Sequence, residues 1–211
     1  MIISLIIRLL LINCVAVLWT ILALSACTGD KDAFSVDNQP VFVDNGTNLE
    51  IASGIIIPFT LNQIIEGADV IISGTVSDIL PSEEGPLLRD NDDTFIYTDV
   101  IINVNTCYIG QVEYDTIAIR TRGGRIGNNV LIDENSPEFK IGEQVVLYLA
   151  DLDIGKPPDG MSMESVYKVY TTQGKALIQG DIVIHEDKDN SILSLQELIE
   201  RISTVRSEKQ E

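Results

Sequence analysis

The stretch FIYTDVIINVNTCY, residues 95–108, is the longest strand candidate in the chain and decides its fold class. Apolar side chains recur at every second position in each of its two halves, which is the period of a β-strand with one buried face. These positions are Phe95, Tyr97, Val100, Ile102 and Val104. Other β-branched runs separated by turn residues predict further strands at 70–80, 112–121, 130–133, 139–149, 167–171, 175–179 and 181–185.

Two helices are predicted at the ends of this β-rich region. Thr60 and Gln63 have the spacing of a capping box, and Gly67 ends the short helix that follows. Ser194 and Glu197 form a second box. It opens a helix predicted over residues 195–206, where apolar residues recur at steps of three and four.

Many short strands with regular turns and only two helices predict a mainly β fold. We expect a small, partly closed antiparallel barrel, OB-like, or a sandwich, of about six to eight strands. A short helix precedes the strands and the amphipathic helix follows them. The barrel is preferred because closure removes exposed strand edges.

The first 26 residues are typical of an export signal. Arg8 is their only charged residue, and an uncharged apolar run follows it and ends in small residues. The residues Leu24-Ser25-Ala26-Cys27 resemble the lipobox of prokaryotic lipoproteins. The resemblance implies cleavage before Cys27 and a lipid on its sulfur. An uncleaved single-span anchor is the alternative, and both place the bulk of the chain outside the cytoplasm at a membrane.

The predicted organisation follows from this start. Residues 1–26 are the signal peptide, and residues 27–50 are a polar, lipidated tether. Residues 51–211 form a single β-rich domain that ends in the helix at 195–206.

Short motifs along residues 68–185 resemble a broad group of uncharacterised exported prokaryotic proteins. The resemblance implies a small β-barrel domain and brings no catalytic residues with it. The motifs are Ala68-Asp69-Val70-Ile71, Gly74-Thr75-Val76, Tyr97-Thr98, Gly110, Gly123-Gly124, Phe139-Lys140-Ile141-Gly142-Glu143, Leu147-Tyr148-Leu149, Tyr167 and Gln173-Gly174-Lys175.

Composition excludes several partners and types of stabilisation. With 32 acidic and 14 basic residues the formal net charge is −18, which repels phosphate backbones and argues against nucleic acid as a partner. Of the three cysteines, Cys14 lies in the signal and Cys27 at the lipid site. Cys107 therefore has no intramolecular partner, and a disulfide framework is not expected.

Few residues could support catalysis. His185 is the only histidine and the chain has no G-x-S-x-G motif, so a solvated histidine at a strand end is expected. Cys107 lies in an apolar strand pattern that is typical of a buried, inert thiol. One histidine and one unpaired cysteine cannot form a zinc site. Paired carboxylates for hydrolysis stay open, because the acids are numerous.

Two loop regions are candidates for binding. Asp90, Asp92 and Asp93 cluster at one loop tip, where oxygen ligands could hold Ca²⁺; no other cofactor is expected. In an otherwise acidic chain, one strip combines arginines with glycines, a pattern typical of an ordinary strand-end turn, with a contact to an anion or a partner as the alternative. The strip contains Arg120, Arg122, Gly123, Gly124 and Arg125.

These observations predict a membrane-anchored extracytoplasmic lipoprotein that acts as a non-enzymatic binding or interaction module. The expected partners are the membrane, through the lipid, and a protein or envelope ligand. A carboxylate-dependent extracytoplasmic hydrolase and a structural component of the cell envelope are the alternatives.

Overall fold

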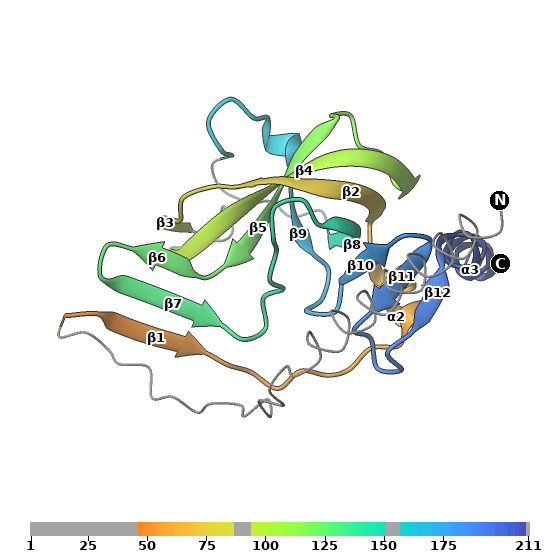
Figure 1. Cartoon of the computed structure of the whole chain (residues 1–211), viewed down its shortest axis with the longest axis horizontal. Helices are drawn as coiled ribbons and strands as arrows, with labels where there is room; N and C mark the ends of the chain where they lie inside the picture. Colours follow the sequence, from red (N-terminus) through yellow and green to blue (C-terminus); the bar gives the residue numbers. More distant parts are fainter. Residues whose placement is uncertain (1–45, 87–93, 151–156, 210–211) are drawn as a thin grey trace, which may run out of the picture. The chain divides into compact units, whose positions relative to one another are not determined.

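The computed structural model describes residues 46–86, 94–150 and 157–209, all within one compact unit, Val43–Glu211. These residues form a mainly β fold (Figure 1), as predicted. The strands are β1 (Asn48–Ala52), β2 (Val70–Ile79), β3 (Glu83–Pro86), β4 (Thr94–Ile109), β5 (Thr116–Arg122), β6 (Gly124–Ile126), β7 (Asn129–Asp133), β8 (Gln144–Ala150), β9 (Val166–Val169), β10 (Lys175–Gln179), β11 (Ile182–His185) and β12 (Ile192–Ser194). The helices are α2 (Leu61–Gly67), the 3-10 helix η1 (Met163–Ser165) and α3 (Leu195–Glu208).

Five strands of the larger sheet pair in a ring, which closes the sheet partly on itself. β2 pairs with β4, β4 with β5, β5 with β9, β9 with β8, and β8 again with β2. The pairings that close the ring are short: β9 pairs with β5 over two residues and with β8 over two residues. β10 pairs with β8 at residues 145–147, on the same edge as β9, and β11 and β12 continue the sheet from β10.

β8 is buried on both faces at residues 145–149, which explains why this run is continuously apolar, and β2 is buried on both faces over its first half. Side chains alternate along a strand, so neighbouring residues belong to different hydrophobic clusters. One face contributes Ile72 and Leu147 to a cluster that includes Val100 and Ile117 of the ring. The other face contributes side chains such as Tyr148 to a cluster that the two helices cover.

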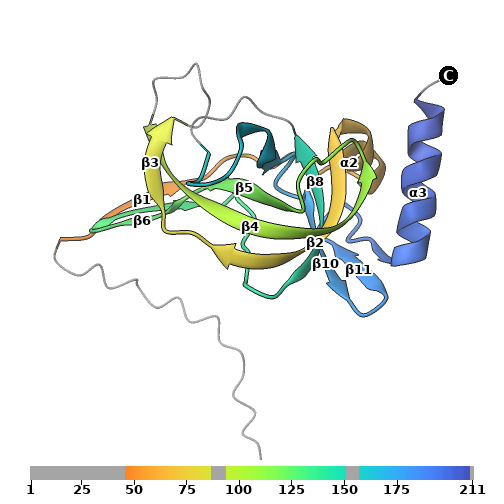
Figure 2. The same ribbon diagram turned by 90° about the horizontal axis from the view of Figure 1, so that it is seen from above.

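α2 and α3 begin at the predicted capping boxes, which are both confirmed. Figure 2 shows α3 beside the strands, on the side where α2 lies. Leu198, Ile202 and Val205 of α3 are buried in the same cluster as Leu61 and Ile64 of α2. The predicted apolar stripe of the last helix is thus the face that packs on the domain. Within the described residues, no helix combines the length and apolar character needed to cross a bilayer.

A smaller sheet of three strands has the order β1-β7-β6. The chain passes from β5 into this sheet at Gly123 and Gly124, whose φ angles are +116° and +140°. A side chain at Gly124 would collide with Ser82 and Thr98. The glycines therefore permit a close approach of the backbone that other residues would resist.

Several details of the prediction are wrong. The described residues contain twelve strands rather than six to eight, because four strands were not predicted. β1 falls largely in the segment assigned to the tether, and β3, β6 and β12 are only three or four residues long. Two pairings, β1 with β7 and β5 with β9, are parallel. β5 begins at Thr116 rather than Val112, and β8 begins at Gln144 rather than Phe139. β1 occupies residues 48–52, so its first three residues fall in the segment assigned to the tether.

Candidate functional site

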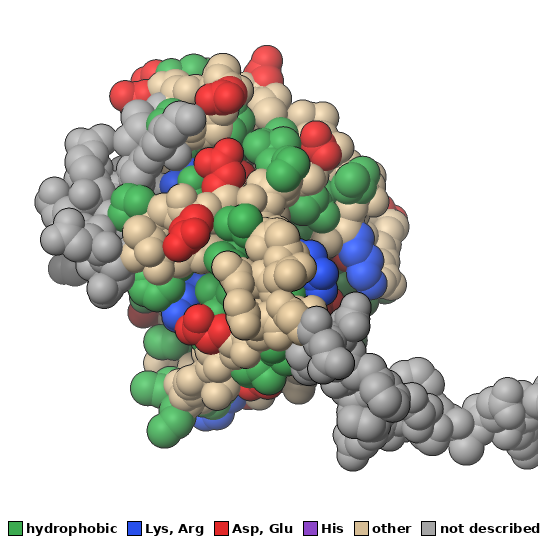
Figure 3. Space-filling model, turned by 90° about the vertical axis from the view of Figure 1, so that its left-hand side faces the viewer, with side chains coloured by type: hydrophobic (Ala, Val, Ile, Leu, Met, Phe, Trp, Pro, Cys, Tyr) green, Lys and Arg blue, Asp and Glu red, His purple; other side chains and the backbone are tan. Residues whose placement is uncertain are grey.

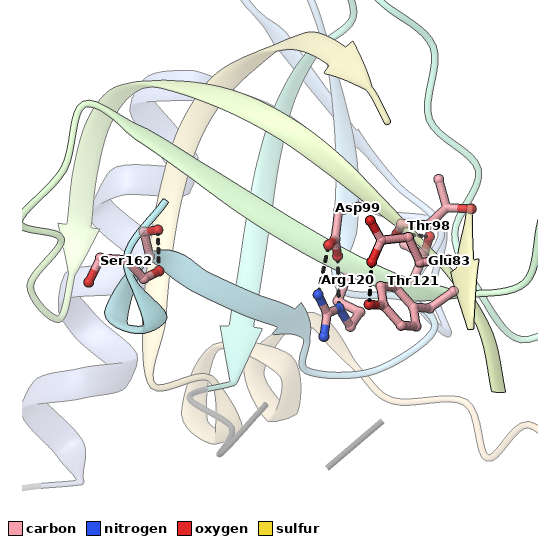
Figure 4. A network of polar contacts seen from close by, with 8 residues as sticks. Glu83, Thr98, Asp99, Arg120, Thr121 and Ser162 are labelled. Carbon is pink, nitrogen blue, oxygen red and sulfur yellow. Dashed lines mark hydrogen bonds and ion pairs between the residues drawn. The ribbon is translucent and has the colours of Figure 1, made fainter. Parts of the chain in front are cut away.

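A buried ion pair joins β4 to β5 on the outer face of the ring. Asp99 and Arg120 stand opposite each other in the antiparallel ladder. Arg120 donates from Nε to Asp99 Oδ1 at 2.8 Å and from Nη2 to Oδ2 at 2.7 Å, and the side chains of Arg120 and Asp99 are 2% and 7% exposed (Figure 4). The guanidinium also stacks on Tyr97, 3.9 Å from the ring centroid. This bidentate geometry fixes the Arg120 side chain firmly.

The hydroxyl of Tyr97 extends the same network. It donates to Glu83 Oε2 at 3.1 Å, a contact drawn in Figure 4. Burial raises the pKa of Tyr97, so this phenol stays protonated and acts as a donor. The network therefore ties β3 to the outer face of β4.

Arg122 lies two residues beyond Arg120 and on the same face of β5. Its guanidinium stacks on Phe95 at 4.3 Å from the ring centroid, and Nη1 lies 4.0 Å from Asp133 Oδ2. Its side chain is 31% exposed, but its Nε is buried and has no hydrogen-bond partner among the described residues. Arg122 thus presents a buried donor that lacks an acceptor.

Arg120 and Arg122 line a cleft of about 390 Å³ at the ends of β5 and β9. These parallel strands pair only at residues 118–119 and 166–167, and the cleft lies where they no longer pair. Lys168 of β9 lines it as well, and no acidic partner of Lys168 is present in the described parts of the chain. Hydroxyl and amide groups complete the walls, from Thr121, Asn135, Ser136, Tyr170, Thr171 and Thr172.

The rest of the predicted arginine–glycine strip is placed elsewhere. Gly123 and Gly124 form the crossing between the two sheets, where Thr98 Oγ1 donates to the Gly123 carbonyl at 2.8 Å. Arg125 is exposed on β6 and does not line the cleft. Its backbone N–H donates to Ser82 Oγ at 3.0 Å. The structure brings two of the three arginines together and leaves the third apart.

The predicted calcium ligands Asp90, Asp92 and Asp93 lie outside the described residues. Within the described ranges, no group of three or more His, Cys, Asp or Glu side chains is arranged to hold a metal ion. Asp187, another acidic loop residue, is buried and accepts from the N–H groups of Leu61 and Ser191 at 3.1 and 2.6 Å. Its carboxylate joins the start of α2 to the loop after β11.

His185 is buried, and the prediction of a solvated side chain is wrong. It is 1% exposed, and its Nε2 lies 2.8 Å from the hydroxyl of Tyr148. Burial lowers the pKa of His185, against the opposing influence of the Ser191 carbonyl and the Asp187 carboxylate. Burial also raises the pKa of Tyr148. The pair is a neutral hydrogen bond inside the cluster beneath the helices, away from the cleft that Arg120 and Arg122 line.

Cys107 is exposed, contrary to the expectation of a buried thiol. The register of β2 with β4 shifts between Ile71 and Ile72, next to the partner of Cys107, so simple alternation fails at this end of the strand. Partial burial raises the pKa of the thiol, whose Sγ donates to the Ile109 carbonyl at 3.2 Å. A raised pKa disfavours the thiolate and hence nucleophilic chemistry.

On the face shown in Figure 3, acidic side chains are scattered among hydrophobic ones and form no single large patch. The sequence identified the arginines of the cleft but missed Asp99, Asp133 and Lys168. Asp99 could be recognised only from the register of β4 with β5, and Lys168 only from the parallel pairing of β5 with β9.

Comparison with protein-family models and with curated proteins gives no match to the chain.

Proposed function

We propose that the chain is a membrane-anchored extracytoplasmic lipoprotein whose β domain is a non-enzymatic binding module of the OB-like type. The lipobox-like residues before Cys27 support the anchor. The ring order β2-β4-β5-β9-β8, with β5 and β9 parallel, supports the OB-like assignment. Barrels of this type bind oligosaccharides or oligonucleotides on one face and the adjoining loops. The net charge of −18 argues against the oligonucleotide.

The ligand proposed for the module is a carboxylated saccharide of the cell envelope. One observation carries this assignment: the buried Nε of Arg122 lacks an acceptor in a cleft that also contains Lys168. An arginine in this setting favours a carboxylate, which it can bind through two parallel hydrogen bonds. The surrounding threonine, serine and asparagine side chains suit sugar hydroxyls.

The experiment is calorimetric titration of the full chain, in nonionic detergent, with the monosaccharide galacturonate and with its methyl ester. The ester keeps the shape of the sugar and removes its charge. We expect saturable binding of the acid and binding of the ester that is weaker by about tenfold or more. Arg122→Ala should weaken binding of the acid by a similar factor. Arg125→Ala is the matched control, because that arginine lies outside the cleft. Equal binding of acid and ester would refute the assignment.

The anchor has its own test. Cys27→Ser removes the sulfur that would carry the lipid, so the variant should lose lipid incorporation and stay uncleaved. Mass spectrometry of the N-terminal peptide of the exported protein reads out both effects. A wild-type chain that keeps residues 1–26 would instead support the uncleaved span.

A calcium site at Asp90, Asp92 and Asp93 is a separate proposal. A site that binds only the folded protein raises its melting temperature saturably with ligand concentration. Melting the full chain with Ca²⁺, and with Mg²⁺ as the control, tests it. An equal rise with both ions assigns these acids to the solvated surface.

The hydrolase and the structural envelope component are the rival functions. Among the described residues, the two carboxylates that are buried, those of Asp99 and Asp187, are both engaged in structural contacts. Release of reducing ends from envelope polysaccharides by the purified chain would favour the hydrolase. Ordered self-assembly of the chain would favour the structural component.

A further inference from the structure

A second cavity, of about 720 Å³, lies between the segment that follows β7 and the hairpin formed by β10 and β11. We call it the hairpin groove. Its volume is within the range of pockets that bind ligands. Apolar side chains from four separate parts of the chain line it: Ile56, Ile132, Pro137, Leu177 and Ile184.

This apolar lining is partly open to solvent. Ile56 is 48% exposed and Ile132 is 47% exposed. Large exposed aliphatic side chains that lie together in a concave site favour an apolar partner, because covering them removes apolar surface from water.

The rest of the groove lining is predominantly acidic. Five carboxylates line it, from Asp133, Glu134, Glu138, Glu143 and Glu186, against two lysines, Lys140 and Lys175. Lys175 is neutralised by Glu143, 2.8 Å from its Nζ. Glu134, Glu138 and Glu186 have no cationic partner in the described parts of the chain. The groove thus combines an apolar lining with an excess of negative charge.

We propose that the hairpin groove docks a cationic amphipathic segment of a partner protein, in an extended conformation. Alternating apolar and basic residues in such a segment send one set of side chains toward the isoleucines and the other toward the carboxylates. A segment of about six residues is roughly 20 Å long. Charge complementarity selects this occupant over a second copy of the chain, whose own net charge is negative. The proposal is independent of the ligand assigned to the Arg122 cleft.

The test uses a labelled peptide of alternating lysine and leucine and the full chain in nonionic detergent. Fluorescence anisotropy measures binding. Two matched peptides separate the contributions: alternating lysine and serine keeps the charge, and alternating glutamate and leucine reverses it. We expect one-to-one saturable binding of the lysine–leucine peptide and binding of each of the other two that is weaker by about tenfold or more.

The site is identified by variants. The triple variant Glu134→Gln/Glu138→Gln/Glu186→Gln should weaken binding by about tenfold, since three charge pairs at the rim of the groove are lost. The double variant Glu66→Gln/Glu113→Gln changes exposed acids outside the groove and should bind as the wild type does. Circular dichroism confirms that each variant is folded.

Three outcomes would overturn the proposal. Equal binding of the lysine–serine peptide would reduce the interaction to general attraction by an acidic protein. An unaffected triple variant, or an equal loss in the control double variant, would place binding elsewhere. Sedimentation that shows self-association blocked by the triple variant would assign the groove to a second copy.

Discussion

Asp99→Asn should cost the domain a large part of its stability. The substitution keeps the size of the side chain and removes its charge, while Arg120 keeps its own. Because Arg120 is 2% exposed, solvent cannot take over the lost interaction. The guanidinium stays buried and loses the Asp99 carboxylate, with Tyr97 still stacked on it at 3.9 Å.

The magnitude follows from this geometry. Removing one partner of a buried ion pair typically costs about 3–5 kcal/mol, because an uncompensated charge stays buried. The stacking of Arg120 on Tyr97 is present before and after the substitution, so it does not change this difference. We expect a loss of about 3 kcal/mol for Asp99→Asn, at the lower end of the range, because Arg120 keeps a further interaction that the substitution leaves in place. Asp99→Leu/Arg120→Met, which replaces both charges by apolar groups, should lose about 1 kcal/mol or less.

Urea-induced unfolding of the full chain in detergent, followed by circular dichroism, measures these differences. Arg122→Met is the matched control from the same strand. Its side chain is 31% exposed and its nearest carboxylate oxygen is 4.0 Å away, so a loss of about 1 kcal/mol or less is expected. The reasoning is refuted if Asp99→Asn costs no more than this control. It is equally refuted if Asp99→Leu/Arg120→Met costs as much as Asp99→Asn.

Three further predictions concern stability. The lowered pKa of His185 means that folding favours its neutral form, so its contribution to the free energy of unfolding is complete above about pH 6.5 and falls as the pH drops below that value. In urea titrations at several pH values, His185→Gln should flatten the dependence of the unfolding free energy on pH, and an unchanged dependence contradicts the assignment. Gly124→Ala should cost about 2 kcal/mol or more in the same assay, because its φ is +140° and the added Cβ would collide with side chains. Gly127→Ala, with open space around the added Cβ, should cost about 1 kcal/mol. Equal losses would exclude the collision as the cause. Leu198→Ala, at a position 0% exposed, should lower the free energy of unfolding by about 2–5 kcal/mol. The control Gln196→Ala changes an exposed residue of the same helix and should cost about 0.5 kcal/mol or less. Similar losses at both positions would argue against the docking of α3.

Local signals in the sequence predicted the helices well. Thr60 with Gln63 and Ser194 with Glu197 are contacts within one turn, so spacing alone identifies them. The strands predicted at 175–179 and 181–185 pair as a hairpin around Gly180, whose φ of +63° suits glycine.

The remaining features of the fold and the site could not be predicted, because they depend on pairing between residues far apart in the sequence. The register of β4 with β5 places Asp99 opposite Arg120 across 21 residues, and no local pattern contains that distance. Burial of His185 depends on helices that arrive from both ends of the domain, so a strand-end position expected to be solvated is covered. For the same reason the sequence identified Arg122 as a binding candidate but could not locate Lys168 beside it.

The end of β7 and the short segment after it line both the Arg122 cleft and the hairpin groove, through Asp133, Asn135, Ser136 and Pro137. Two ligands that contact the same segment are thermodynamically linked whenever either shifts its position. By linkage, the factor by which an acidic saccharide changes the affinity for a basic segment equals the factor by which the segment changes the affinity for the saccharide. The sign of that single coupling free energy decides whether the domain holds both ligands together or exchanges one for the other.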